Sequence, residues 1–230
     1  MTLLLVSLAS TVAVAAAMRS TWSPCGLSML STITPMGERG RGHRYTSTAA
    51  WFVTGAVLGG ATLGAGAALL AAGAAALDLS GEARVGLAAV LAAVTIASDL
   101  AVGGLRLPSH TRQVNEGWLG QYRSWVYGGG FGWQIGVGLA TYVTTAAVYL
   151  MVALAALTAS PLAAFAVITG FGLVRGLAVF LGRGLTTPPQ MLALHRRLEE
   201  LLPMAQRAIV LVQAAVLAVA AGAAWGPAPA

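Results

Sequence analysis

The sequence predicts an all-α integral membrane protein with six transmembrane helices, arranged as two inverted three-helix repeats with the first helix of each repeat broken. Hydrophobic residues make up 57% of the 230 residues and charged residues only 9%, and the mean hydropathy is +0.79. Several apolar runs approach or exceed the roughly 20 residues that a helix needs to cross a bilayer. All 13 basic residues are arginine, and most of them lie in the loops between those runs.

The first apolar run covers residues 2–35 and is too long for one crossing. As one straight helix it would measure roughly 50 Å, at about 1.5 Å per residue, against a hydrocarbon core of roughly 30 Å. We expect it to break at Ser23-Pro24, because Pro24 removes a backbone donor and clashes with the preceding turn. Ser23 is a good N-cap, and proline suits the first position of a new helix.

This break places Cys25, the only cysteine of the chain, in the first turn of a half-helix. Free N–H groups at that end of the helix favour a reactive thiolate, so Cys25 is the candidate catalytic residue. Ser23, Pro24 and the following Pro35 frame it. The alternative is that Cys25 is a small, packed core residue.

Residues 2–18 also have features of a secretory signal peptide, since Ala15-Ala16-Ala17 resembles a cleavage site. No basic residue precedes the run, however, and the segment beyond Arg19 is still apolar. We therefore expect a membrane helix that is retained.

Five further spans follow, at residues 49–77, 84–105, 127–158, 162–182 and 207–225. A short amphipathic helix is expected around residues 195–200. Three loops hold nine of the arginines: Arg39, Arg41, Arg44, Arg106, Arg112, Arg123, Arg183, Arg196 and Arg197. The loops on the opposite side hold at most Arg84. The positive-inside rule then places the basic loops in the cytoplasm of a bacterium and both termini outside its inner membrane.

The sequence predicts a single membrane domain, residues 1–230, made of two similar halves. Repeat 1 covers about 1–105, a cytoplasmic linker about 106–126, and repeat 2 about 127–230. Each half has three spans, of which the first is long and interrupted. Because three is odd, the halves enter the membrane from opposite sides, which is the pattern of an inverted repeat with its broken helices meeting near the midplane. Glycines such as Gly60, Gly172 and Gly176 are typical of helices that pack closely.

Three ionisable residues fall inside the predicted spans: Arg19, Asp99 and Arg175. Asp99 and Arg175 each lie about seven residues from the cytoplasmic end of a span, at a similar depth, so a buried pair is expected. Arg19 lies near the same level and competes for Asp99. A charge inside a membrane is a functional hypothesis by default, with a structural ion pair or an arginine reaching to the headgroups as the alternatives.

Hydroxyl groups gather near the two breaks, at Thr32, Thr34, Thr141, Tyr142, Thr144 and Thr145. They are placed to bind a substrate or an ion beside unwound backbone, or to satisfy the carbonyl groups that the breaks set free.

Several classes of function are excluded by what the sequence lacks. The net charge of +6 is explained by membrane topology, so no nucleic-acid partner is expected. His43, His110 and His195 have no metal-ligand spacing, and one cysteine cannot form a metal cluster or an intrachain disulfide. No cofactor and no metal are expected; the lipid bilayer is the expected partner.

The chain resembles the CcdA family and the transmembrane domain of DsbD. The resemblance covers nearly the whole chain: a Ser-Pro-Cys element at residues 23–25, Pro35, six spans, and Gly-Leu-Val-Arg-Gly-Leu at residues 172–177. It implies transfer of reducing equivalents from cytoplasmic thioredoxin to thiol proteins outside the membrane, as in cytochrome c maturation. The family does this with two membrane cysteines, one in each repeat.

The sequence departs from this pattern at the second cysteine, where Gly136 or a neighbour stands instead. A thiol–disulfide cycle needs a second thiol, so a thioredoxin-like protein or another membrane or extracytoplasmic protein would have to supply it. The expected function is thus a CcdA-like thiol-disulfide role using a single cysteine. The alternatives are a small-solute or ion transporter on the same scaffold, and a non-catalytic membrane subunit that assists assembly of another complex.

Overall fold

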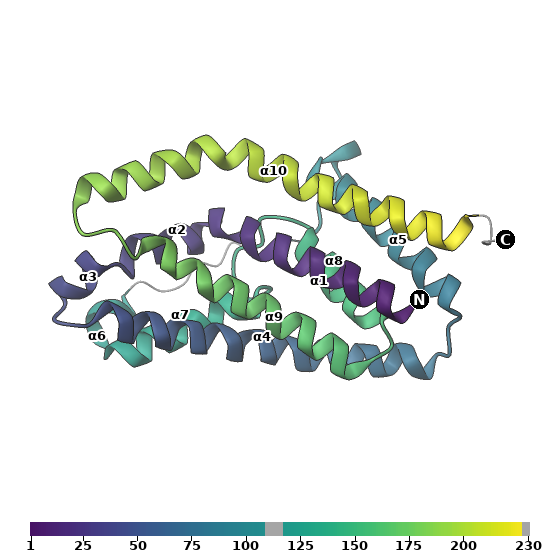
Figure 1. Ribbon diagram of the computed structural model, residues 1–230, viewed down its shortest axis with the longest axis horizontal. Helices are drawn as coiled ribbons and strands as arrows, with labels where there is room; N and C mark the ends of the chain where they lie inside the picture. Colours follow the sequence, from purple (N-terminus) through teal and green to yellow (C-terminus); the bar gives the residue numbers. More distant parts are fainter. Residues whose placement is uncertain (109–116, 227–230) are drawn as a thin grey trace.

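The computed structural model describes residues 1–108 and 117–226, and its described part consists of helices without any strand. Figure 1 shows an elongated bundle in which the N-terminus and the end of the last helix lie at the same end. The helices, in chain order, are α1 (Thr2–Arg19), η1 (Ser20–Trp22), α2 (Pro24–Thr32), α3 (Pro35–Gly40), α4 (Tyr45–Ala76), α5 (Gly81–Asp99), η2 (Val102–Gly104), α6 (Trp118–Gln121), α7 (Ser124–Val137), α8 (Ala147–Leu157), α9 (Pro161–Leu177), η3 (Ala178–Gly182) and α10 (Pro188–Trp225).

Five helical segments are long and apolar enough to cross a membrane: α1 with η1, α4, α5, α9 with η3, and α10. The all-α membrane class predicted from the sequence is therefore confirmed. The predicted fourth span, residues 127–158, is interrupted, as expected for the first helix of the second repeat. It is divided between α7 and α8, and the residues from 138 to 146 between them are not helical.

The break predicted at Ser23-Pro24 is confirmed. Ser23 has an extended backbone, and its hydroxyl accepts a hydrogen bond from the N–H of Gly26 at 3.0 Å. Pro24 opens α2, and Cys25 follows it in the first turn, as expected from the preference of proline for the start of a helix. Pro35 does the same for α3, where the Thr34 hydroxyl accepts from the N–H of Gly37 at 3.0 Å.

Three predicted boundaries need correction. The third span ends at Asp99 rather than at residue 105, because Ala101, Gly103 and Gly104 have positive φ angles that no α-helix continues through. The stretch between the first two predicted spans, residues 36–48, was expected to be a loop, but it holds most of the short helix α3 and the start of α4. The amphipathic segment around residues 195–200 is not a separate helix but part of α10, which runs through Pro203 and bends along its length (Figure 1).

Helices α4, α7 and α9 pack tightly against one another. At Gly60 an added Cβ would lie 2.9 Å from the Cα of Gly172, and at Gly136 it would meet the backbone carbonyl of Ala56. Such contacts leave no room for a side chain, and they confirm the prediction that small residues let these helices approach closely.

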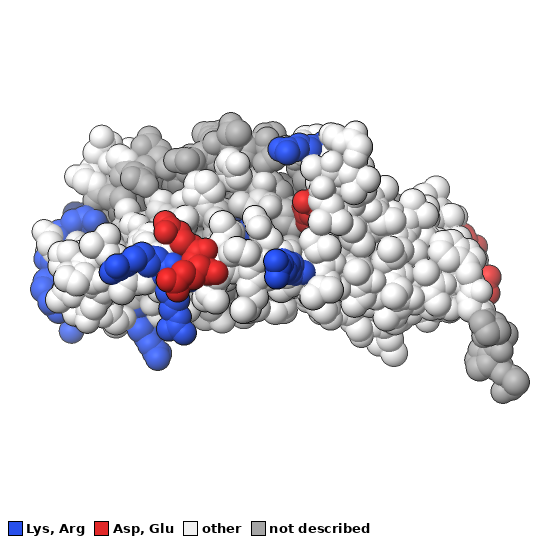
Figure 2. Space-filling model, turned by 90° about the horizontal axis from the view of Figure 1, so that it is seen from above, with Lys and Arg blue, Asp and Glu red and all other residues white. Residues whose placement is uncertain are grey.

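The ends of the molecule differ in charge. Arginines such as Arg39, Arg44 and Arg183 gather at the end that holds α3 and the start of α10, which we call the basic end (Figure 2). The opposite end holds the N-terminus and the turn from α4 to α5, with the acidic residues Asp78 and Glu82. Residues 109–116, in the middle of the predicted linker and including Arg112, lie outside the described residues.

Candidate functional site

Asp99 connects α5 to the start of α8 and to α10. Its carboxylate accepts hydrogen bonds from the Thr145 hydroxyl at 2.6 Å and from the backbone N–H of Ala146 at 2.7 Å. The side-chain amide of Gln213 on α10 donates to it at 3.0 Å. A carboxylate at a helix N-terminus satisfies free N–H groups and stabilises the positive end of the helix dipole. Asp99 therefore caps the second half of the interrupted span.

Arg19, the last residue of α1, lies beside this carboxylate. Its side chain is only 8% exposed and interacts electrostatically with Asp99, but the two groups form no ion pair within 4.0 Å. The Nη1 atom of Arg19 is buried and has no hydrogen-bond partner among the described residues. Thr144, next to the cap, has a buried hydroxyl that is also without a partner there.

Two cavities meet at Arg19, Asp99 and Thr144. The larger, of about 650 Å³, is closed by α10 between Pro203 and Leu211. The smaller, of about 410 Å³, extends toward Arg106 and Tyr142. Near the middle of the face in Figure 2, an acidic side chain is visible between basic ones. We call the cap and the two cavities the Asp99 site.

Arg175 lies on the α7 side of the break between α7 and α8. It is 4% exposed, and its Nη1 donates to the carbonyl of Ile135 at 2.6 Å, near the end of α7. Its guanidinium lies 5.7 Å from the ring centroid of Phe171. Gly138, which follows α7 with φ +71°, fits against that ring, so any side chain there would displace it. The same carbonyl accepts from the backbone N–H of Gly138 at 3.1 Å, so Arg175 adds a second donor to the last turn of α7.

The expected pair between Asp99 and Arg175 does not form. Asp99 faces the start of α8 and Arg175 the end of α7, so each charge stabilises one end of the interrupted span. The sequence placed both charges seven residues inside a helix. Asp99 instead ends α5, and its carboxylate is free to reach a neighbouring helix terminus.

Cys25 is 1% exposed and a free thiol. It belongs to an apolar cluster that joins α2, α4 and α7, with Met29, Phe52, Phe131 and Ile135 among its members. A reactive role for Cys25 stays a prediction, but these surroundings are those of a packed core cysteine.

The hydroxyls near the breaks divide into two groups. Thr32 donates to the carbonyl of Ser28 at 2.8 Å, and Thr34 and Thr145 take part in helix caps. Thr32 thus bonds to a backbone carbonyl, as one of the two expectations had it, whereas Thr34 and Thr145 accept from backbone N–H groups at helix starts. Thr141 and Thr144 have buried hydroxyls without a partner among the described residues. Tyr142 lines the smaller cavity beside Asp99.

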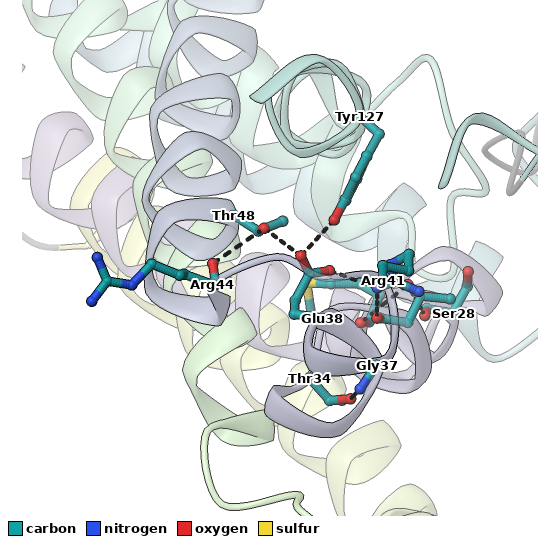
Figure 3. Close-up of polar contacts among 10 residues, drawn as sticks. Ser28, Thr34, Gly37, Glu38, Arg41, Arg44, Thr48 and Tyr127 are labelled. Carbon is teal, nitrogen blue, oxygen red and sulfur yellow. Dashed lines mark hydrogen bonds and ion pairs between the residues drawn. The ribbon is translucent and has the colours of Figure 1, made fainter. Parts of the chain in front are cut away.

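Sequence reasoning missed another carboxylate, Glu38 on α3, which is completely buried (Figure 3). One oxygen accepts from Arg41 at 2.5 Å, and the other accepts from the hydroxyls of Thr48 on α4 and Tyr127 on α7, each at 2.5 Å. Burial alone would lower the pKa of the Arg41 guanidinium, but the hydrogen bond and charge of Glu38 outweigh burial and raise it. The spacing Glu38–Arg41 was visible in the sequence, yet its position in an Arg/Gly-rich segment indicated solvent.

The arrangement provides fixed charges and capped helix ends rather than a reacting pair. Among the described residues no group of His, Cys, Asp or Glu could hold a metal ion. The Asp99 site offers unpartnered donors beside two cavities, which is the chemistry of binding.

Comparison with known proteins finds similarity to the methylamine utilization protein MauF of several bacteria. The chain is 35% identical to that of Paracoccus versutus over 171 residues, 34% to that of Paracoccus denitrificans over 175 and 32% to that of Methylorubrum extorquens over 166. The alignments cover 73%, 73% and 69% of this chain but 61%, 60% and 56% of the relatives. The chain thus spans about three-fifths of the length of these curated relatives. No family model and no solved structure matches.

These similarities contradict the function expected from the sequence. The relatives are named for methylamine utilization, not for CcdA-like thiol-disulfide exchange, cytochrome c biogenesis or transport. Their names give no support for a thioredoxin-like partner either. The resemblance to the CcdA family is tested by none of these proteins and stays a prediction.

Proposed function

We propose that this chain is an integral membrane protein of a bacterium that serves methylamine utilization. The observation that carries the proposal is its identity of 32–35% with MauF proteins from four bacteria, over 69–73% of its length. The helices long enough to cross a bilayer support the membrane location.

The experiment that tests this role is complementation. A Paracoccus denitrificans strain that lacks its own MauF would receive the gene for this chain and be grown on methylamine as the only carbon source. Restored growth supports the proposal. If the chain is present in the membrane at the level of the native protein and growth is not restored, the proposed role is overturned for this chain. Growth of the same strain on a multicarbon substrate controls for general fitness.

The proposal includes a topology with six crossings. The first, α1, continues past a break into α2, and the fourth, α8, is preceded by a break after α7; the other four are α4, α5, α9 and α10. The broken crossings begin the two halves, which supports an inverted repeat. The arginines at the basic end support a cytoplasmic location for that end and extracytoplasmic termini.

Cysteine labelling in intact cells tests the topology. In a Cys25→Ala background, Ala76→Cys places a thiol at the end opposite the arginines, and Ser47→Cys places one at the basic end; both positions are exposed. A membrane-impermeant maleimide should label the first in intact cells and the second only after permeabilisation. The reverse pattern would contradict the orientation, and labelling of both in intact cells would contradict the separation of the two ends by the membrane.

A further inference from the structure

The Asp99 site carries an excess of positive charge. Arg19 and Arg207 line the larger cavity, and Arg19 and Arg106 line the smaller one. The carboxylate of Asp99, the acidic group in both linings, already accepts three hydrogen bonds from the chain itself. Three arginines and one carboxylate therefore line the two cavities, and the site as a whole favours an anion.

A buried hydrogen-bond donor of Arg19 has no partner among the described residues, and this indicates what kind of group the Asp99 site binds. Arg19 is more than nine-tenths buried, and its Nη1 donates to no described residue. A buried guanidinium without partners is costly, and phosphate oxygens are among the strongest acceptors for one. Thr144, whose hydroxyl is also buried and without a partner among the described residues, lines both cavities.

An apolar groove adjoins the larger cavity. It has a volume of about 350 Å³, lies between α1 and α10, and shares Arg19 and Ile209 with that cavity. Its other walls are almost entirely apolar, from Trp22 and Met204 near the basic end to Ala15 and Val212 further along the helices. A molecule that fills both spaces has an anionic head and a hydrocarbon chain.

The depth of the charges matches a lipid headgroup. The helical distances from Thr2 to Arg19, from Gly81 to Asp99 and from Trp225 to Arg207 are each about 27 Å at about 1.5 Å per residue. The hydrocarbon core of a bilayer is roughly 30 Å thick. If the membrane begins at the end opposite the arginines, the three charged residues lie where the headgroups of the other leaflet begin.

We propose that the Asp99 site binds the phosphate of an anionic phospholipid through Arg19, Arg207 and Thr144, with an acyl chain in the groove between α1 and α10. Basic pockets between membrane helices bind anionic headgroups in this way. The proposal stands independently of the role in methylamine utilization.

The test uses the full chain, purified in detergent and delipidated, and titrated with phosphatidylglycerol or, as the neutral match, phosphatidylcholine. We expect phosphatidylglycerol to bind saturably, seen as a bound lipid by native mass spectrometry and as a rise in the unfolding temperature. Arg19→Gln and Arg207→Gln should each weaken binding about tenfold, which is the size of one lost charge-assisted hydrogen bond. Arg39→Gln, an exposed arginine at the basic end, should change it less than about twofold.

Several outcomes would overturn the proposal. One is equal binding by the Arg207→Gln and Arg39→Gln proteins, because the lipid would then only surround the helices; Arg207 is exposed, so its variant should fold even if Arg19→Gln does not. Equal binding of phosphatidylcholine would mean that the head charge is not recognised. Competition by millimolar inorganic phosphate would assign the site to a soluble phosphate instead of a lipid.

Discussion

At the scale of single residues, the polar side chains described above mainly form hydrogen bonds with backbone groups at the ends of interrupted helices. Asp99 caps α8, Arg175 satisfies a carbonyl of α7, and Ser23 caps α2. Each interruption exposes backbone groups that the interior of a membrane protein cannot leave unpaired. Asp99 and Arg175, which the sequence indicated as functional candidates, therefore have a structural role.

Asp99→Asn tests this purpose. The substitution keeps the size of the side chain but replaces an oxygen that accepts hydrogen bonds by an amide nitrogen that cannot. We expect a loss of roughly 1–3 kcal/mol in the free energy of unfolding, measured by detergent or denaturant titration of the purified protein. Asp78→Asn, at an exposed turn, is the matched control and should change stability by less than about 0.5 kcal/mol. Equal stability of the two variants would show that the cap is not needed.

Cys25→Ala separates packing from reactivity. Cys25 is buried in an apolar cluster, and the chain has no second cysteine to resolve a mixed disulfide. We therefore expect the variant to restore growth on methylamine as well as the unchanged chain does in the complementation strain, with a stability loss of about 1 kcal/mol from the cavity. If the Cys25→Ala and Cys25→Ser proteins are both present at normal levels but neither restores growth, the function requires the thiol.

The sequence could predict the caps but not the partners of the charges. Ser23, Pro24 and Pro35 act within a few residues of themselves, and local rules place them correctly. The partners of Asp99 are set by where α5 ends, and that end depends on the positive φ angles at Ala101, Gly103 and Gly104. The function could not be read from the same residues, because a Ser-Pro-Cys element fixes a helix start and leaves open what chemistry occurs there.

At the scale of elements, Glu38 ties three helices together at the basic end. Its carboxylate connects α3 to α4 through Thr48 and to α7 through Tyr127 (Figure 3). Arg41 balances its charge and also donates to the carbonyl of Thr32 at 2.5 Å. These contacts join α3, α4 and α7 through one buried side chain.

Glu38→Gln should therefore loosen these helices. An amide offers one acceptor oxygen in place of two and leaves the partly buried Arg41 uncompensated, so we expect a loss of about 3 kcal/mol in stability. Limited proteolysis should show faster cleavage between α3 and α4. Glu200→Gln, an exposed glutamate on α10, provides the control. Unchanged proteolysis in the Glu38 variant would contradict the view that this carboxylate holds the three helices.

At the scale of the whole molecule, close packing of α4, α7 and α9 forms a rigid layer beside the interrupted span. The glycines that permit it were recognisable in the sequence, but which helices they join was not, since glycine spacing shows a face and not its neighbour. The packing partners of the six predicted crossings could not be predicted from the sequence for the same reason. Helical periodicity and length predicted that the fourth crossing is interrupted, but they could not give the partners, Asp99 and Arg175, that bind the helix ends beside residues 138–146.

Two glycine-to-alanine substitutions test whether this layer determines stability. Gly136→Ala lies in the contact between α7 and α4, and Gly66→Ala lies on α4 where no neighbouring atom is close. The methyl group at Gly136 would meet the backbone carbonyl of Ala56 on α4, and a backbone cannot move aside as a flexible side chain can. We expect a loss of roughly 1–3 kcal/mol in the free energy of unfolding. At Gly66 no atom lies within 4 Å of the added Cβ, so the better helix propensity of alanine should dominate and leave the protein equally or more stable. Both variants are compared with the unchanged chain by denaturant titration in the same detergent. A stability for Gly136→Ala equal to that of Gly66→Ala would mean that α4 and α7 can separate without cost, and the layer could not then be what holds the interrupted span in place.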